Sequence, residues 1–193
     1  MEYPVQTIPE QLVYERTDQG PIYYRGYRAY LDGSKTLEEI MGSSILQSSL
    51  VTDLVYALST LGKEYRVLAS ELGIQLAKGK CRAADIAIVR RDQMATVQNK
   101  RKYLGFPPEV VIEVDIKADL EVVEGLQDSL GYVDAKTEEL FDFGVKKVVW
   151  ILTETEKVIV AEAGRPWTVV DWQEDILILE ACRINVKAIV DEI

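Results

Sequence analysis

The hydrophobic and polar positions of the chain change period several times, and each change marks a predicted element. Residues 10–17 and 22–31 are rich in tyrosine and branched apolar side chains, as in short paired strands. Gly20 and Pro21 lie between the two segments and are a strong turn signal. This pattern predicts an N-terminal β-hairpin over about residues 10–31.

A helical period follows the hairpin. From residue 36 to residue 61 the apolar side chains recur at helical spacing, and Gly62 is placed to end the helix. The pattern therefore predicts one long helix over 36–61. Next come three strand-sized segments, 64–70, 71–77 and 83–90. Residues 91–108 have no clear period and are predicted to form a loop.

The segment EVVIEVD, residues 109–115, is the most apolar of these strands and is predicted to be central in a sheet. A second helical region is predicted over 119–143, with a break near Gly131. Strands and turns are predicted after Gly144, in the segments 146–154, 157–164, 167–172, 176–180 and 184–193. The order of elements predicts a single α/β domain over residues 1–193, with a mixed central sheet flanked by helices.

Two of the predicted strands carry acids inside apolar runs. Asp85 lies within AADIAIV, and Glu113 and Asp115 end EVVIEVD. Alternate residues of a strand share a face, so Glu113 and Asp115 are expected on the same side. If the two strands pair, up to three carboxylates converge, and their repulsion calls for a cation such as a divalent metal. The alternative is that each acid is solvated or paired with an arginine, which is the better explanation for Asp85 alone.

The composition limits the chemistry that such a cluster can support. The chain has no histidine, and its two cysteines, Cys81 and Cys182, lie far apart. These counts exclude Cys/His zinc sites and Ser-His-Asp triads. A metal must then be held by oxygen atoms, which favours magnesium, manganese or calcium. A general base must be a lysine, a carboxylate or a metal-bound water.

A lysine lies on the apolar stripe of the second predicted helix. Lys136, Leu140 and Phe143 are spaced at i, i+4 and i+7, so Lys136 faces the sheet. It can extend outward past the apolar surface or form a structural ion pair. Alternatively, its ammonium reaches the carboxylates. Two acids, a metal and a lysine are the parts needed for metal-dependent phosphodiester hydrolysis.

Five segments together resemble a known family: LQSSLVTDLVYALS, ELGIQL, AADIAIVRRD, GFPPEVVIEV and KTEELFDFGVKKVVWIL. They are similar to the bacterial "putative restriction endonuclease" domain family, formerly a domain of unknown function, within the PD-(D/E)XK nuclease superfamily. The resemblance covers nearly the whole chain from about Leu12. It implies a restriction-endonuclease-like core and a Mg²⁺- or Mn²⁺-dependent endonuclease, a hydrolase that acts on DNA.

The resemblance also implies a role for each matching residue. Asp85 takes the place of the first motif acid and Glu113 the second, and both would be metal ligands together with the backbone carbonyl of Val114. The superfamily lysine normally lies two residues after the second acid, where this chain has Asp115. The resemblance implies that Lys136, on the following helix, replaces it.

Further positions match the family or depart from it. Glu71 matches a family acid on the preceding strand, and Glu71 and Asp115 are expected beside the metal ligands. Ala84 stands where the family usually has proline, and Asp115 where it is usually apolar. The acidic segment 117–134 lengthens the connection to Lys136. Four of its apolar residues could pack as an extra helix or lid: Leu120, Val123, Leu126 and Leu130.

The charge of the chain bears on its partners. The net charge is −10 and the pI about 4.7, which argues against strong nonspecific binding of nucleic acid. The basic run NKRKY, residues 99–103, either contacts phosphates or is simply solvated. Two alternatives to the enzyme therefore stand: a catalytically inactive nuclease-fold protein that acts as a binding or regulatory partner, and a structural α/β domain with ion-paired acids.

Assembly and location complete the expectations. Members of the superfamily often pair, and the tyrosine-rich hairpin offers an apolar edge, so a homodimer is expected. The longest apolar runs are strand-sized, so no membrane span is expected. The first ten residues lack the basic start and apolar core of a secretory signal, so a cytoplasmic location is expected.

Overall fold

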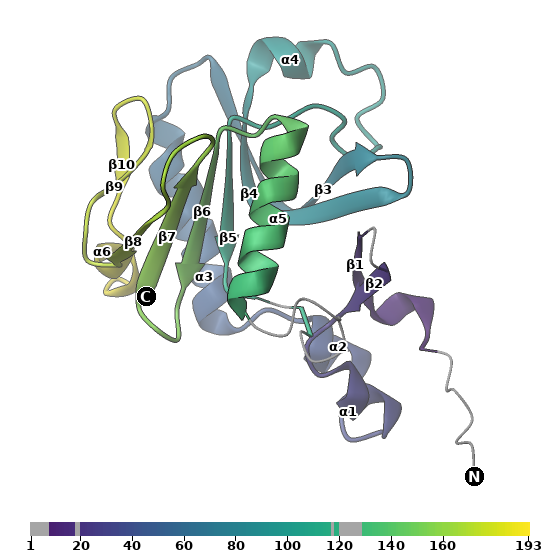
Figure 1. Cartoon of the computed structure of the whole chain (residues 1–193). Helices are drawn as coiled ribbons and strands as arrows, with labels where there is room; N and C mark the ends of the chain where they lie inside the picture. Colours follow the sequence, from purple (N-terminus) through teal and green to yellow (C-terminus); the bar gives the residue numbers. More distant parts are fainter. Residues whose placement is uncertain (1–7, 18–19, 117, 120–128) are drawn as a thin grey trace.

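The central feature of the fold is one eight-stranded sheet (Figure 1). The structure is a computed structural model that describes residues 8–17, 20–116, 118–119 and 129–193. The strands of the sheet are β1 (Val13–Thr17), β2 (Gly20–Tyr23), β3 (Tyr65–Ala77), β4 (Lys80–Arg90), β5 (Val110–Val114), β6 (Lys147–Leu152), β7 (Lys157–Glu162) and β8 (Thr168–Asp171). Their order is β2-β1-β4-β5-β6-β7-β8, and β3 pairs with β4 outside this path.

Strand β5 lies in the middle of the sheet, as its apolar sequence predicts. It pairs antiparallel with β4 and parallel with β6, and all five of its residues are buried. The other strand pairs are antiparallel. A parallel pair requires a crossover between its strands, and that crossover contains the helix α5 (Ser129–Phe143).

Helices cover both faces of the sheet. Figure 1 shows α5 in front of the strands and α3 behind them. Leu50 and Leu54 of α3 pack in one core with Ile112 of β5. Leu140 of α5 packs in the other core with Val111. The remaining elements are η1 (Glu10–Leu12), α1 (Tyr27–Leu31), α2 (Leu37–Met41), α3 (Ile45–Ala57), η2 (Leu58–Thr60), α4 (Arg91–Ala95), β9 (Ile176–Leu179), β10 (Cys182–Ile184) and α6 (Val186–Val190).

The mixed α/β class is confirmed, but the single helix over 36–61 is wrong. The chain leaves α2 at Gly42, whose ψ of 145° is extended. Ser44 then starts α3 as its N-cap, because its side chain accepts a hydrogen bond from the Gln47 backbone N–H. A serine that caps a new helix satisfies one of the free N–H groups at its start, which makes the break at Gly42 stable.

The N-terminal hairpin is present but shorter than 10–31. Its second arm ends at Tyr23, and the predicted continuation of that arm forms α1 instead. Gly26 precedes α1 with a φ of +85°, a left-handed conformation that glycine adopts without steric strain. This turn directs the chain away from β1, so residues 27–31 cannot continue the strand.

Two predicted strands, 64–70 and 71–77, form the single strand β3, which contains a bulge. The bulge lies at Ser70 and Glu71, whose φ angles are +78° and +54°. An extra residue in one strand bends that strand and interrupts its alternation. The two sequence patterns therefore belong to the two halves of one bent strand.

Three other boundaries also differ from the sequence prediction. The predicted loop 91–108 begins with α4, and the segment 184–193 contains α6 instead of continuing as a strand. Helix α5 runs through Gly131 without a break. Of the predicted extra helix or lid, residues 120–128 lie outside the described residues, and Leu130 belongs to α5. None of the helices in the described ranges has the length and apolar character needed to cross a bilayer.

Candidate active site

The two predicted motif acids lie on neighbouring strands. Asp85 on β4 and Glu113 on β5 lie next to the paired residues Ile86 and Ile112, on the same side of that pair in the antiparallel ladder. Both side chains are buried. The Oδ2 atom of Asp85 accepts a hydrogen bond of 2.7 Å from the backbone N–H of Val114. The strand pairing that the sequence left conditional is therefore present.

Lys136 of α5 reaches Glu113 from the helix layer. Its Nζ atom lies 3.2 Å from Glu113 Oε1, and its side chain is fully enclosed. Because α5 packs on the face of β5 that carries Val111 and Glu113, the lysine on its apolar stripe points at the carboxylate. Glu113 thus faces a cation inside the protein. The structure therefore brings Lys136 to Glu113, while Asp85 lies beside Glu113 on the neighbouring strand.

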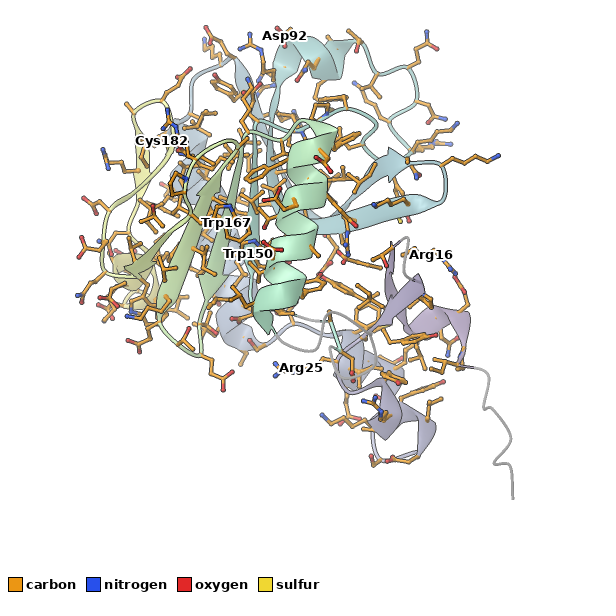
Figure 2. The ribbon with its side chains drawn as sticks, in the orientation of Figure 1. Arg16, Arg25, Asp92, Trp150, Trp167 and Cys182 are labelled. Carbon is orange, nitrogen blue, oxygen red and sulfur yellow. The ribbon has the colours of Figure 1, made fainter. Side chains whose placement is uncertain are left out.

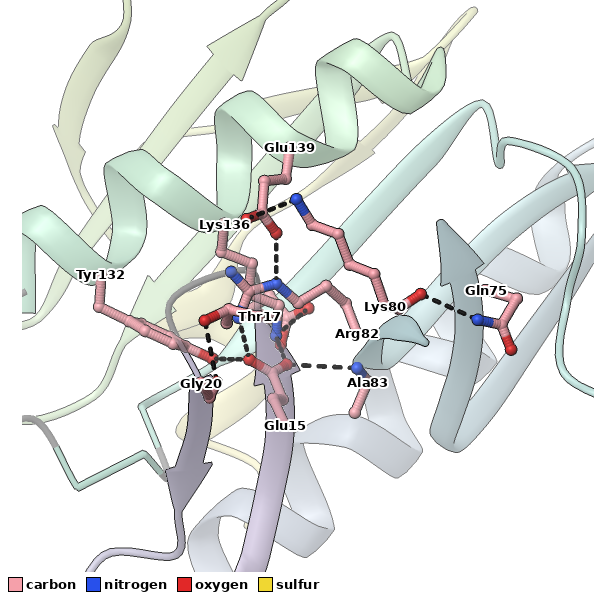
Figure 3. A network of polar contacts seen from close by, with 11 residues as sticks. Glu15, Thr17, Gly20, Gln75, Lys80, Arg82, Ala83, Tyr132, Lys136 and Glu139 are labelled. Carbon is pink, nitrogen blue, oxygen red and sulfur yellow. Dashed lines mark hydrogen bonds and ion pairs between the residues drawn. The ribbon is translucent and has the colours of Figure 1, made fainter. Parts of the chain in front are cut away.

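A second carboxylate, Glu15, binds the same lysine. Its Oε1 lies 2.9 Å from Lys136 Nζ, and its Oε2 lies 2.6 Å from Arg82 Nη1. Tyr132 donates a hydrogen bond of 2.8 Å to Oε2. Figure 3 shows Glu15 on β1 beneath Tyr132 and Lys136 of α5. The site is therefore a buried network of alternating charges.

Sequence reasoning missed Glu15, Arg82 and Tyr132. Arg82 lies on β4, three residues before Asp85, and it also binds Glu139 of α5, with Nε 2.7 Å from Oε2. Two signals were available: Arg82 is a charged residue within a strand, and Tyr132 lies one turn before Lys136 on the same helix stripe. Nothing in the local sequence of Glu15 indicates its partners, because they lie far away in the chain.

Burial and charge set the protonation states. Burial raises the pKa of Glu113 to about 8, and the carboxylates of Asp85 and Glu15 add to this effect while Lys136 opposes it. Burial also disfavours the ammonium of Lys136, but Glu113 and Glu15 raise its pKa above the ordinary value. For Glu15, burial is outweighed by Lys136 and Arg82, which lower its pKa. Lys136 is therefore a permanent cation, with ionised Glu15 as its counter-ion.

The tyrosine of the network stays protonated. Burial, together with the charges of Glu15 and Glu113, raises the pKa of Tyr132 well above its ordinary value. Its hydroxyl therefore stays protonated at neutral pH and donates its hydrogen bond to Glu15. Behind it, Trp150 of β6 lies beside α5 (Figure 2) and donates to Thr137 with an Nε1–Oγ1 distance of 3.0 Å. The helix face around Lys136 is thus fixed by side-chain bonds as well as by packing.

Asp115 does not join the cluster, contrary to the expectation from strand alternation. Strand β5 ends at Val114, and Asp115 has a φ of +60°, so the two-residue period no longer applies. Its carboxylate accepts hydrogen bonds from Thr153, with Oδ1 2.8 Å from the backbone N and Oδ2 2.8 Å from Oγ1. Asp115 thus ties the end of β5 to the turn after β6.

The Val114 carbonyl and Glu71 lie on the other side of Asp85. Gln47 of α3 donates a hydrogen bond of 2.8 Å to the Val114 carbonyl oxygen, which has a second lone pair. A cleft of about 440 Å³ runs between α3 and the bulge of β3, and its lining includes Gln47, Glu71 and Asp85. Glu113 and Lys136 are outside this lining. Asp85 is therefore the member of the set that faces the cleft.

The donors near Asp85 and Glu113 are oxygen atoms, the type that a hard cation prefers. The available protein ligands are the carboxylates of Asp85 and Glu113 and the Val114 carbonyl, all oxygen atoms, and Glu113 Oε1 is a buried acceptor without a well-aligned hydrogen bond within the described structure. No group of three or more acidic or cysteine side chains arranged to hold a metal is found in the described part of the chain. Magnesium is commonly bound through one or two carboxylates with several waters; of the two carboxylates, Asp85 lines the cleft, and Glu113 is enclosed beside Lys136.

The basic run 99–103 lies beside β3. Lys100, Arg101 and Lys102 are all exposed, and the Tyr103 ring covers Gly73 while 61% of the residue remains accessible. The neighbouring Leu104 bonds through its backbone to β3, which anchors the loop. These side chains form a local positive surface on an acidic protein.

Comparison with known proteins extends these observations. No family model matches the chain, and no match is found among curated proteins. Among solved structures, the chain is similar to a protein from Anabaena variabilis ATCC 29413 described as a "putative nuclease belonging to DUF820". The TM-score is 0.59 at 12% sequence identity, over 77% of this chain and 82% of that one. At this identity the likeness concerns the fold alone. The chain therefore has a nuclease-like fold.

Proposed function

We propose that the protein is a metal-dependent endonuclease of the PD-(D/E)XK type that hydrolyses phosphodiester bonds in DNA. One observation supports the proposal most directly: Glu113 of β5 lies next to Asp85 of β4 in the strand ladder and forms an ion pair with Lys136 of α5. Two acids and one lysine are the side chains that such chemistry requires. The nuclease-like fold supports the same conclusion.

In this proposal the acids hold the metal ion. Asp85 and Glu113, with the Val114 carbonyl, are the ligands for Mg²⁺ or Mn²⁺. When bound, the ion polarises a phosphate oxygen and lowers the pKa of a bound water. Because burial raises the pKa of Glu113 to about 8, its carboxyl group releases a proton at neutral pH when a cation binds. Metal affinity should therefore rise between pH 6 and 8.

Lys136 supplies a fixed positive charge. Its raised pKa makes it a poor general base, so its role is to stabilise negative charge as it develops on the phosphate and to orient the nucleophile. A charge that is already oriented in a site shielded from water is worth more than one in solution. The exposed lysines and arginine of the run 99–103 would contact the DNA backbone, and binding should weaken strongly with salt.

A second candidate is a nuclease-fold protein that has lost catalysis and acts as a binding or regulatory partner. The burial of the site favours this candidate, because Glu113 is 2% and Lys136 0% exposed and neither is accessible to a substrate. Asp115, where the superfamily usually has its lysine, binds Thr153 instead. In this candidate the same residues form a structural ion-pair network.

The two candidates are separated by measuring metal response and DNA cleavage together. Mg²⁺ or Mn²⁺ should raise the melting temperature of the parent, because a ligand that binds the folded state stabilises it. Supercoiled plasmid should be nicked under the same conditions. Asp85→Asn should lose both effects, whereas Lys136→Ala should keep the metal response and lose cleavage.

A matched control is Asp92→Asn, the same chemical change on α4, where the carboxylate is exposed and far from Trp150 in Figure 2. It should behave like the parent in both assays. A parent protein that shows neither a metal response nor cleavage would exclude the endonuclease and leave the inactive binding partner.

A further inference from the structure

Glu15 stands out because its carboxylate is enclosed by donors from two other parts of the chain, β4 and α5. It reaches the site on β1, within the N-terminal hairpin, and is 2% exposed. Arg82 and Tyr132 bind its Oε2, and the Ala83 backbone N–H donates to Oε1 over 3.2 Å. Lys136 lies 2.9 Å from the same Oε1 atom. Because both oxygen atoms of the Glu15 carboxylate have partners, its side chain is fixed in one position.

The ammonium of Lys136 depends on that position. Its ion-pair partners within the described structure are Glu15 and Glu113. Around it are the rings of Trp150, Tyr132 and Tyr14, with centroids 5.5, 5.7 and 5.9 Å from Nζ. The ring faces attract the ammonium, but the carboxylates form its ion pairs and so determine its position. The hairpin contributes both Glu15 and Tyr14 to this enclosure.

We infer that Glu15 is a positioning residue for Lys136. Its carboxylate, fixed by Arg82 and Tyr132, holds the ammonium of Lys136 beside Glu113. This inference rests on the proposed function for its catalytic meaning. A purely structural role would instead have Glu15 neutralise Arg82 and attach the hairpin to the sheet.

Glu139 provides a matched comparison for separating the two roles. Like Glu15, it forms an ion pair with Arg82, and it also binds Lys80 with Nζ 3.1 Å from Oε1 (Figure 3). The partners of Lys136 described above do not include it. Glu139→Gln therefore perturbs Arg82 by the same chemical change as Glu15→Gln, while leaving the Lys136 pairs in place.

The first measurement is steady-state cleavage of DNA with saturating Mg²⁺. Glu15→Gln should lower kcat on the order of 100-fold, because small misplacements of a catalytic group have effects of that size. KM and the metal-induced rise in melting temperature should stay unchanged. Glu15→Asp keeps the charge and should recover part of kcat. Glu139→Gln should keep the parental kcat, and an equal loss of kcat in Glu15→Gln and Glu139→Gln would overturn the inference.

The second measurement does not depend on activity. A fully buried, ion-paired lysine ammonium exchanges its protons slowly, so the ¹⁵Nζ signal of Lys136 should be visible by NMR and absent in Lys136→Ala. The signal should shift in Glu15→Gln and Glu15→Asp and stay in place in Glu139→Gln. A signal that is unchanged in the Glu15 variants would overturn the inference. Lack of cleavage by the parent would instead reject the proposed function, and the NMR signal would still decide the positioning role.

Discussion

Replacing Glu113 by glutamine tests the buried charge at the centre of the site. Glutamine keeps the shape of the side chain and removes its ability to ionise. Burial raises the pKa of Glu113 to about 8 from a usual value of 4.5. Between these two pH values the folded protein keeps a proton that the unfolded chain has released. The stabilisation by this proton is complete below pH 4.5 and is lost as the pH rises through 8.

The size of the effect follows from the width of that window. Each pH unit between the two pKa values changes the free energy of unfolding by about 1.4 kcal/mol, so ionising Glu113 destabilises the parent by roughly 5 kcal/mol at pH 9 relative to pH 4. Glu113→Gln has no such group. The difference in unfolding free energy, variant minus parent, should therefore increase by this amount across the range in favour of the variant.

The assay is urea unfolding without added metal at several pH values from 4 to 9. Other groups titrate as well, but they are common to both proteins and largely cancel in the difference. Glu109→Gln is the matched control, because it makes the same change one residue before β5, at an ion pair with Lys146, whose side chain is 70% exposed. It measures the effect of the same glutamate-to-glutamine change at a position outside the ion pairs of Lys136.

The opposite result is equally specific. If Glu113 is ionised at all these pH values and acts only as a structural partner of Lys136, Glu113→Gln should be less stable than the parent by a constant amount. Breaking a buried ion pair from one side typically costs about 3–5 kcal/mol. A flat, negative difference of that size would refute the reasoning from burial.

Two further predictions concern packing and assembly. Gly73→Ala should lower stability by about 1–2 kcal/mol in urea unfolding, because a Cβ atom there would lie 2.6 Å from the Tyr103 ring, whereas Gly105→Ala, with open space around it, should have little effect. Strand β2 forms an edge of the sheet, and we expect two copies of the chain to pair; light scattering that gives 21.8 kDa at all concentrations would contradict this expectation.

The parts of the site that could be predicted are those with a local pattern. Asp85 and Glu113 lie in apolar strand segments, and Lys136 lies on the apolar stripe of a helix, so each is recognisable without its neighbours. Their convergence then needs only the pairing of two strands and the packing of one helix. The mixed α/β class follows from the same periodicity.

The parts that failed depend on single backbone angles or on distant partners. Asp115 was expected beside Glu113, but its φ of +60° ends the strand alternation, and the sequence gives no sign of this. The long helix 36–61 is divided at Gly42 by a cap that competes with the helical period. Glu15 meets Arg82 across 67 residues of the chain, a distance over which local patterns carry no information.

The ion pairs of the hairpin also limit the order in which contacts can form as the chain folds. Glu15 is synthesised early, yet Tyr132, which holds it, follows 117 residues later, and β1 pairs with β4 at Arg16 and Cys81. Contacts of such long range form late in folding, because closing the intervening chain costs entropy first. On the ribosome, the contacts of Glu15 with Tyr132 and Lys136 can therefore form only after α5 has emerged. A chain without β1 would leave Arg82 and Lys136 with one of their carboxylate partners missing.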